Sequence, residues 1–290
     1  MRFNKQLLKK LLLNIKYWVL PPGIFRFLRY YKLSAVSFYF FRMPIIRMNN
    51  RLLDKHKGKR CFIVCNGPSL KTQNIRILKK ELVFTVSNGF LHPDFEYINP
   101  KYHCIPQISY DVMPKLEAAK WLNSIDRHIG NAEIFLDHQE FSLIKKNKLF
   151  LKRQVHFMCL GKNNFSSSKK IPDIDGLIPR VQTVPIMALM IAMYMGFKEI
   201  YLLGVDHDWF VKKEYSYFYG KGVTRLDPKS LKDGENLSLL LDELPIVTKV
   251  FYQYRCINKI AKANGVKIFN ATNGGMLDEF ERTDFKELFK

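Results

Sequence analysis

The chain has 290 residues, of which 47% are hydrophobic, and a formal net charge of +21. Residues 1–60 carry fifteen lysines and arginines against the single acid Asp54, a net of +14, so that +7 belongs to the rest of the chain. The length allows one large domain with an appended segment. The uneven charge argues against a uniformly basic nucleic-acid-binding domain, and we expect no nucleic-acid partner.

The basic excess lies in residues 1–56, where cations alternate with leucines and aromatic residues. The uncharged stretches 17–25 and 33–41 have nine residues each, whereas a spanning helix needs about 20. The pattern predicts a basic amphipathic helical segment on an anionic membrane surface. A helical hairpin that packs on the protein itself is an alternative. A secretory signal peptide is another, although Pro21-Pro22 interrupts its apolar region.

The five cysteines include no Cys-x-x-Cys pair, and most lie in apolar runs. This usage is typical of small core residues in a reducing compartment. We therefore expect a cytoplasmic protein that is peripheral on the inner membrane.

From residue 57 to residue 290 apolar runs alternate with amphipathic stretches, which we take as a second, catalytic domain. Strands are predicted at 61–65, 83–86, 102–106, 132–136, 199–205 and 267–270. Helices are predicted from about Pro68 and at 115–125, 184–195 and 247–264. Residues 141–179 look irregular, and residues 209–246 look like a lid-like loop. The alternation predicts an α/β fold with a doubly wound, mostly parallel, Rossmann-like sheet.

Small or polar residues follow four of the predicted strands. They are Asn66-Gly67, Ser87-Asn88, Asp206-His207 and Asn270-Ala271. Ligands of doubly wound sheets bind beyond the carboxyl ends of the strands. The sequence therefore predicts one binding site that is built from these ends.

The segment Asn66-Gly67-Pro68-Ser69 follows the first strand directly. A tight glycine turn that leads into a helix N-terminus would present backbone N–H groups to a phosphate. An ordinary strand-to-helix loop without a ligand is the alternative.

Asn88 and Asn270 offer amide donors and acceptors for a ribose, a phosphate or a base edge. Thr183 precedes a predicted helix, which it could cap, or it could reach the same phosphate. Each asparagine taken alone fits a turn residue equally well.

Asp206-His207-Asp208 is the candidate catalytic segment. His207 could act as a general base, and Asp208 could orient it or bind a metal ion. In the alternative interpretation Asp206 binds a ribose hydroxyl and His207 only packs. The chain has neither a P-loop motif nor Gly-x-Gly-x-x-Gly, which argues against a P-loop ATPase and a standard NAD-binding domain.

The blocks CNGPSL, SNGF, GFKEIYLLGVD and NATNGG resemble a bacterial family of 6-hydroxymethylpterin diphosphokinase-like proteins. Members are common in surface-polysaccharide and flagellin-glycosylation loci. The resemblance extends over residues 57–288.

The same blocks are similar to the family 42 sialyltransferases, which use CMP-sialic acid and have a variant of the GT-A fold. That resemblance implies nucleotide contacts from the NGPSL segment, Asn88, Gly204 and Asp206. The family also has a catalytic histidine between the Gly-x-Asp strand and the last helix, but residues 209–246 contain no histidine. The base would then be His207 or Asp208, or the reaction differs.

The preferred hypothesis is a glycosyltransferase that moves an acidic nonulosonic-type sugar from a CMP donor to a glycan or lipid-linked acceptor of the bacterial surface, such as lipopolysaccharide or capsule. It needs no metal or other cofactor. Tyr217, Tyr219 or Lys221 would stabilise the leaving phosphate. The alternative is a pterin-type diphosphokinase that uses ATP and Mg²⁺, with Asp206 and Asp208 as ligands. A third possibility is a non-catalytic protein of a glycan gene cluster.

Overall fold

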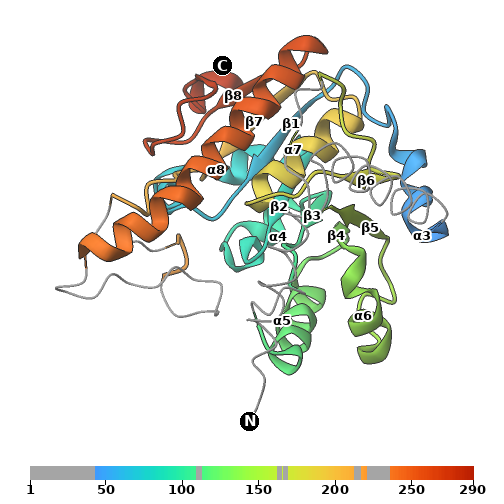
Figure 1. Cartoon of the computed structure of the whole chain (residues 1–290). Coiled ribbons are helices and arrows are strands. Elements are labelled where there is room, and N and C mark those ends of the chain that lie inside the picture. Colours follow the sequence, from blue (N-terminus) through green and yellow to red (C-terminus); the bar gives the residue numbers. More distant parts are fainter. Residues whose placement is uncertain (1–42, 109–112, 162–164, 166–168, 212–216, 221–235) are drawn as a thin grey trace, which may run out of the picture. The chain divides into compact units, whose positions relative to one another are not determined.

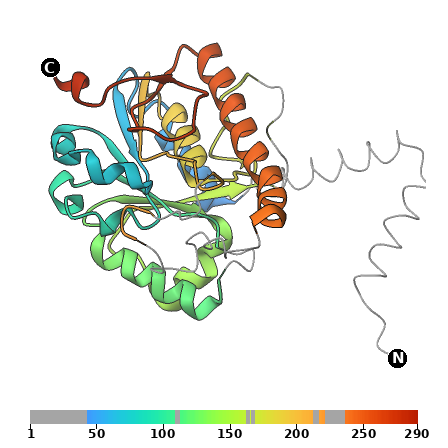
Figure 2. The same ribbon diagram turned by 90° about the vertical axis from the view of Figure 1, so that its left-hand side faces the viewer.

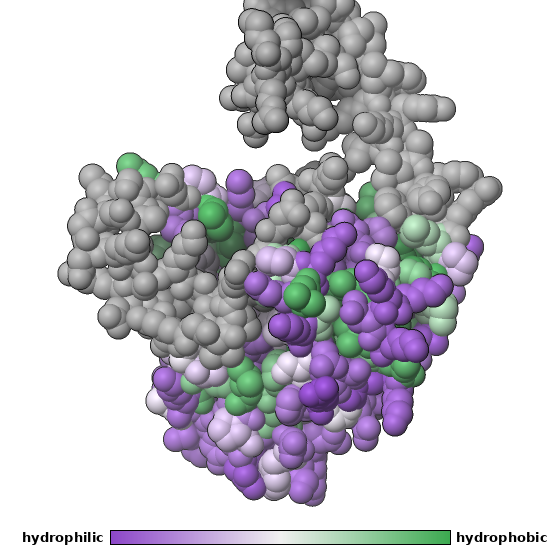
Figure 3. Space-filling model, turned by 90° about the horizontal axis from the view of Figure 1, so that it is seen from below, coloured by the Kyte–Doolittle hydropathy of each residue, from purple (hydrophilic) through white to green (hydrophobic). Residues whose placement is uncertain are grey.

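The computed structural model describes residues 43–108, 113–161, 165, 169–211, 217–220 and 236–290. Residues 44–290 form one compact unit. Within the described residues no helix is both long and apolar enough to cross a membrane. Seen from below, the described surface is mostly hydrophilic with separate apolar areas (Figure 3).

A parallel sheet of nine described strands forms the centre of this unit, in the order β6-β5-β4-β3-β2-β1-β7-β8-β9. The strands are β1 (Arg60–Val64), β2 (Val83–Val86), β3 (Tyr102–Cys104), β4 (Glu133–Asp137), β5 (Val155–Leu160), β6 (Leu177–Ile178), β7 (Glu199–Leu203), β8 (Lys267–Asn270) and β9 (Glu281–Arg282). The predicted α/β fold with a doubly wound parallel sheet is thus confirmed.

Helices cover both faces of the sheet (Figures 1 and 2). The α-helices are α3 (Pro44–Arg47), α4 (Phe95–Ile98), α5 (Lys115–His128), α6 (Phe141–Asn147), α7 (Val184–Tyr194) and α8 (Asn236–Ala263). Short 3-10 helices complete the connections: η1 (Met48–Leu52), η2 (Pro68–Thr72), η3 (Ile75–Lys80), η4 (Gly89–Leu91), η5 (His138–Glu140) and η6 (Lys286–Phe289). One hydrophobic core joins α7 and α8 to the sheet, and two others lie under α5 with α6 and under η2 with η3.

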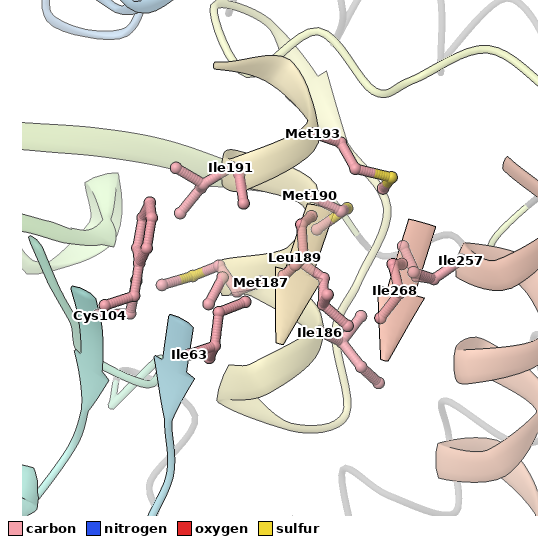
Figure 4. Close-up of a cluster of buried hydrophobic side chains, with 14 of the residues drawn as sticks. Ile63, Cys104, Ile186, Met187, Leu189, Met190, Ile191, Met193, Ile257 and Ile268 are labelled. Carbon is pink, nitrogen blue, oxygen red and sulfur yellow. The ribbon is translucent and has the colours of Figure 1, made fainter. Parts of the chain in front are cut away.

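Helix α7 is buried on all sides. Every residue from Pro185 to Tyr194 is buried, because the sheet lies on one side of the helix and α8 on the other. Figure 4 shows Met187 near Ile63 of β1, and Ile186 near Ile257 of α8. A helix that is apolar all round belongs in the interior of a large domain. The burial of α7 on all sides thereby fixes the position of strand β7, which follows it in the chain.

The sequence boundary at residue 57 is wrong, because residues 44–56 pack into the domain. Ile46 and Leu52 are almost fully buried. Asn49 is also fully buried, and its Nδ2 donates to the carbonyls of Phe157 and Ile174. The imidazole Nε2 of His56 lies 2.7 Å from Tyr102 Oη. These contacts tie the segment to β3 and β5.

Two further regions differ from the expectation. Residues 141–179 are not irregular throughout, since they contain α6, β5 and β6. Helix α8 begins at Asn236 instead of Val247, so residues 236–246 are helical and are not part of a loop. The helix continues through Pro245, although a proline in a helix interior removes one backbone hydrogen bond.

Candidate functional site

The four predicted strand ends lie side by side at one edge of the sheet, because β2, β1, β7 and β8 are neighbours in that order. The chain runs from β1 through β2 to β6 and then returns to β7, on the other side of β1. This reversal makes the junction between β1 and β7 the topological switch point, where doubly wound sheets bind their ligands.

Asp206 locks the two strand ends of this junction together. Its carboxylate accepts hydrogen bonds from Ser69 N at 3.2 Å and from Ser69 Oγ at 2.8 Å. Gly67 N donates to Gly204 O at 2.8 Å. A β-carbon on Gly67 would lie 1.7 Å from Asp206 Oδ2, so only glycine fits here.

This lock changes the interpretation of the NGPSL segment. The helix expected after Pro68 is the five-residue 3-10 helix η2, and its Ser69 N–H is bound by Asp206 and does not point to a phosphate. The phosphate site expected at a helix N-terminus is therefore wrong in this form, because a carboxylate of the chain takes the place of the anion. Pro68 lies at the first position of η2, where its missing N–H costs nothing.

The loop of the NATNGG motif covers the other side of Asp206. Met276 N donates to Asp206 O at 2.7 Å, and a β-carbon on Gly275 would lie 2.5 Å from the same oxygen. Asn270 is fully buried; it donates to Leu277 O and accepts from Thr272 N. The structure thus places Asn270 within the loop, where both ends of its amide bind the backbone.

Asn66 and Asn88 lie beyond β1 and β2 and differ in their hydrogen bonding. Asn66 is 7% exposed, and its Nδ2 donates to Val86 O at 3.2 Å. Its Oδ1 is buried and has no hydrogen-bond partner among the residues that the structure describes. Asn88 Oδ1 accepts from Trp121 Nε1 of α5 at 2.7 Å, and its Nδ2 donates to Tyr219 Oη. Of the two, Asn66 presents the buried acceptor that a ligand donor could satisfy.

Residues 217–220 lie against these two asparagines. Phe218 N donates to Asn66 O at 3.0 Å, and Tyr217 forms a bridge with Gly220. The rings of Tyr217 and Tyr219 are 5.1 Å apart. The structure therefore brings both predicted tyrosines to the strand ends, while Lys221 lies outside the described residues.

His207 lies at the end of β7 in a mainly apolar setting. Its Nε2 is 2.7 Å from Tyr254 Oη of α8, and Trp209 packs edge-on against its ring. Burial lowers the pKa of His207 to about 3. The imidazole is therefore uncharged at neutral pH and a weak proton acceptor. Tyr254 Oη also lies 3.5 Å from Thr183 Oγ1, which links the predicted Thr183 to the same group.

Asp208 is 5% exposed and follows directly in the chain. Among the described residues, no group of three or more histidine, cysteine, aspartate or glutamate side chains could hold a metal ion.

All five cysteines are buried and free, as expected for core residues, and burial raises the pKa of Cys61 and Cys65.

Trp121, Tyr254 and Gln253 were not expected in the site. Trp121 of α5 is 7% exposed, whereas Leu116 at the start of the same helix is 70% exposed. Gln253 of α8 holds the segment that leads into α7, because its Nε2 donates to Arg180 O and its Oε1 accepts from Gln182 N. A glutamine next to a tyrosine in a helix of mixed polarity is a weak signal in the sequence, and only the tertiary packing reveals its role.

The family model described as "6-hydroxymethylpterin diphosphokinase MptE-like" matches residues 42–211, which is more than half of the chain. The chain belongs to this MptE-like family. The matched part begins near the start of the compact unit and includes the ends of β1, β2 and β7. In this MptE-like protein, strands β8 and β9 lie outside the residues that the family model matches.

Among solved structures, the chain is similar to the sialyltransferase CstII from Campylobacter jejuni in complex with a substrate analogue, cytidine-5'-monophosphate. The identity is 16%, the TM-score is 0.40, and the alignment covers 79% of this chain and 88% of the other. No curated protein matches the sequence significantly.

We expect Gly67→Ala to destabilise the protein by about 1–3 kcal/mol, because the added methyl group would displace the Asp206 carboxylate from Ser69. Thermal unfolding measures the loss. Gly176→Ala is the matched control, since its β-carbon would meet nothing closer than 3.8 Å. Equal thermal-unfolding midpoints for the two variants would contradict the importance of the Asp206 contact that joins the ends of β1 and β7.

Acid should destabilise the folded state through His207. The pKa of this histidine is about 3 in the folded protein and about 6.5 when unfolded, so the unfolded state binds the extra proton between these values. The stability that the neutral His207 contributes to the folded state is fully present above pH ~6.5 and is lost as the pH falls toward 3. In His207→Gln, stability measured by urea unfolding should depend less on pH across this range. The exposed His128→Gln variant should behave as wild type, and a slope unchanged by His207→Gln would refute the assignment.

Proposed function

We propose that this protein is a glycosyltransferase whose nucleotide-sugar donor binds at the carboxyl ends of β2, β1 and β7. The observation that carries the proposal is the buried Oδ1 of Asn66 at the switch point of the sheet, for which the described residues supply no hydrogen-bond partner. Leaving a buried acceptor unsatisfied costs about 1–3 kcal/mol. A ribose hydroxyl or the amino group of a nucleobase would donate to it and remove this cost.

The charge of the site favours a donor with one phosphate. The groups described at these strand ends are mainly amides and hydroxyls, together with the carboxylates of Asp206 and Asp208. Asp206 is already bound to Ser69 through both oxygens. The phosphodiester of a CMP-sugar carries a single negative charge, to which an acidic sugar adds one carboxylate. A nucleoside triphosphate carries more negative charge on its phosphates and depends on a divalent cation with carboxylate ligands. The similarity of the CNGPSL and GFKEIYLLGVD blocks to the family 42 sialyltransferases agrees with a CMP donor.

In the proposed reaction an acceptor hydroxyl attacks the anomeric carbon of the sugar. The new carbon–oxygen bond forms as the bond from the anomeric carbon to the phosphate oxygen breaks, and CMP leaves with that electron pair. The hydroxyl proton passes to a base of the protein. Asp208 suits this role better than His207, whose low pKa and bond to Tyr254 make protonation costly.

In this proposal Tyr217 and Tyr219 donate hydrogen bonds to the departing phosphate. The contacts of residues 217–220 with Asn66 and Asn88 support this role. The acceptor in this proposal is a bacterial surface glycan or its lipid-linked precursor, which the basic segment 1–43 would help to reach at the membrane.

The alternative is the diphosphokinase reaction that the family description names. In this hypothesis the protein uses ATP and Mg²⁺. It would require Asp206 and Asp208 to bind the metal ion, and Asp206 would have to exchange its bonds to Ser69 for that ion. We rank it second for this reason.

Isothermal titration of the full-length protein with CMP and with ATP plus Mg²⁺ separates the two functions. We expect CMP to bind without metal, and Asn66→Ala to weaken its binding at least tenfold through the lost acceptor, about 1.4 kcal/mol. Asn147→Ala, at an exposed helix end, is the matched control and should bind as wild type.

Binding of ATP only with Mg²⁺ would favour the diphosphokinase instead. Binding of neither nucleotide would favour a non-catalytic protein and would contradict the proposal.

A further inference from the structure

Lysines gather at the amino edge of the sheet, opposite the strand ends that form the candidate site. Lys59 precedes β1, Lys198 precedes β7, and Lys267 begins β8. The three are neighbours through the backbone, since Lys198 N donates to Lys59 O and Lys267 N donates to Lys198 O. Because β1, β7 and β8 are adjacent and parallel strands (Figure 1), these three residues are neighbours along this edge of the sheet.

The cations of this edge outnumber the acids that could neutralise them. Lys57 pairs with Asp54, Arg60 with Glu81, and both Lys55 and Lys101 with Glu133. Within the described part of the chain, the exposed Lys59, Lys198, Lys262 and Lys267 form no ion pair. Lys262 belongs to this surface because α8 ends here, where Lys198 Nζ binds Asn264 O. These four lysines are called the basic edge below.

We propose that the basic edge binds an anionic membrane surface. Two observations favour a membrane over another polyanion. Leu53, on the segment that leads to Lys59, is 59% exposed and could enter the headgroup layer. The chain that enters the domain at Pro44 comes from residues 1–43, which mix cations with aromatic residues as interfacial segments do.

The inference does not depend on the nucleotide chemistry, since it concerns the opposite edge of the sheet. Each lysine close to an anionic leaflet contributes about a fivefold increase in membrane partitioning. The contributions multiply, so binding by residues 1–43 would not hide a loss at the basic edge. The attraction should weaken at high salt, as expected for exposed charges.

The test is vesicle co-sedimentation of the full-length protein with phosphatidylcholine alone and with added phosphatidylglycerol. The variant carries Lys59→Gln, Lys198→Gln and Lys267→Gln together. The matched control carries Lys71→Gln, Lys120→Gln and Lys145→Gln, which remove the same charge from exposed lysines elsewhere. Thermal unfolding establishes that both remain folded.

We expect the basic-edge variant to lose at least tenfold in partitioning to the anionic vesicles, and the control to lose less than threefold. Equal losses in the two variants would overturn the proposal, because only total charge would then matter. It would also be overturned if the basic-edge variant lost binding to a poly-uridylate RNA while its vesicle binding stayed unchanged.

Discussion

The contact between the Asp206 carboxylate and the Gly67–Ser69 turn is the constraint on which the candidate site depends. It joins the ends of β1 and β7, two strands that lie far apart in the chain and meet only because the connection reverses direction after β6. The contact requires glycine at position 67, since any side chain would enter the space of the carboxylate. The NATNGG loop then packs on the backbone of Asp206, and Asn66 emerges at the rim of this junction.

The lock also determines which chemistry is left for a ligand. Because Asp206 and Asn270 are bound within the chain, the recognition groups at the site are fewer and more neutral than the sequence indicates. Asn66 supplies the buried acceptor, and the Asn88 amide is held in one orientation by Trp121 and Tyr219. These mainly neutral hydrogen-bonding groups suit a nucleoside that carries one phosphate better than they suit a nucleoside triphosphate, which would need added positive charge. The same arrangement makes His207 a packed partner of Tyr254, whose position on α8 depends on the apolar α7.

The sheet and the meeting of the four polar strand ends at one edge were predictable because strand ends carry a local signal. Apolar runs such as that of β1 stop at small or polar residues, and parallel strands bring those residues to one edge. Other features depend on contacts distant in sequence. The two-residue β6 and the two-turn α6 are too short to show a period, and Asn49 looks like a surface residue until the carbonyls of Phe157 and Ile174 are placed beside it. The roles of Ser69 and Tyr254 likewise depend on partners 137 and 47 residues away.

A structure of the full-length protein with CMP tests the central claim most directly. The account predicts the nucleoside beyond the ends of β2, β1 and β7, with a donor of the ribose or the base within hydrogen-bond distance of Asn66 Oδ1 and with the Asp206–Ser69 bonds intact. CMP bound elsewhere on the domain, or bound only after Asp206 has left Ser69, would contradict it.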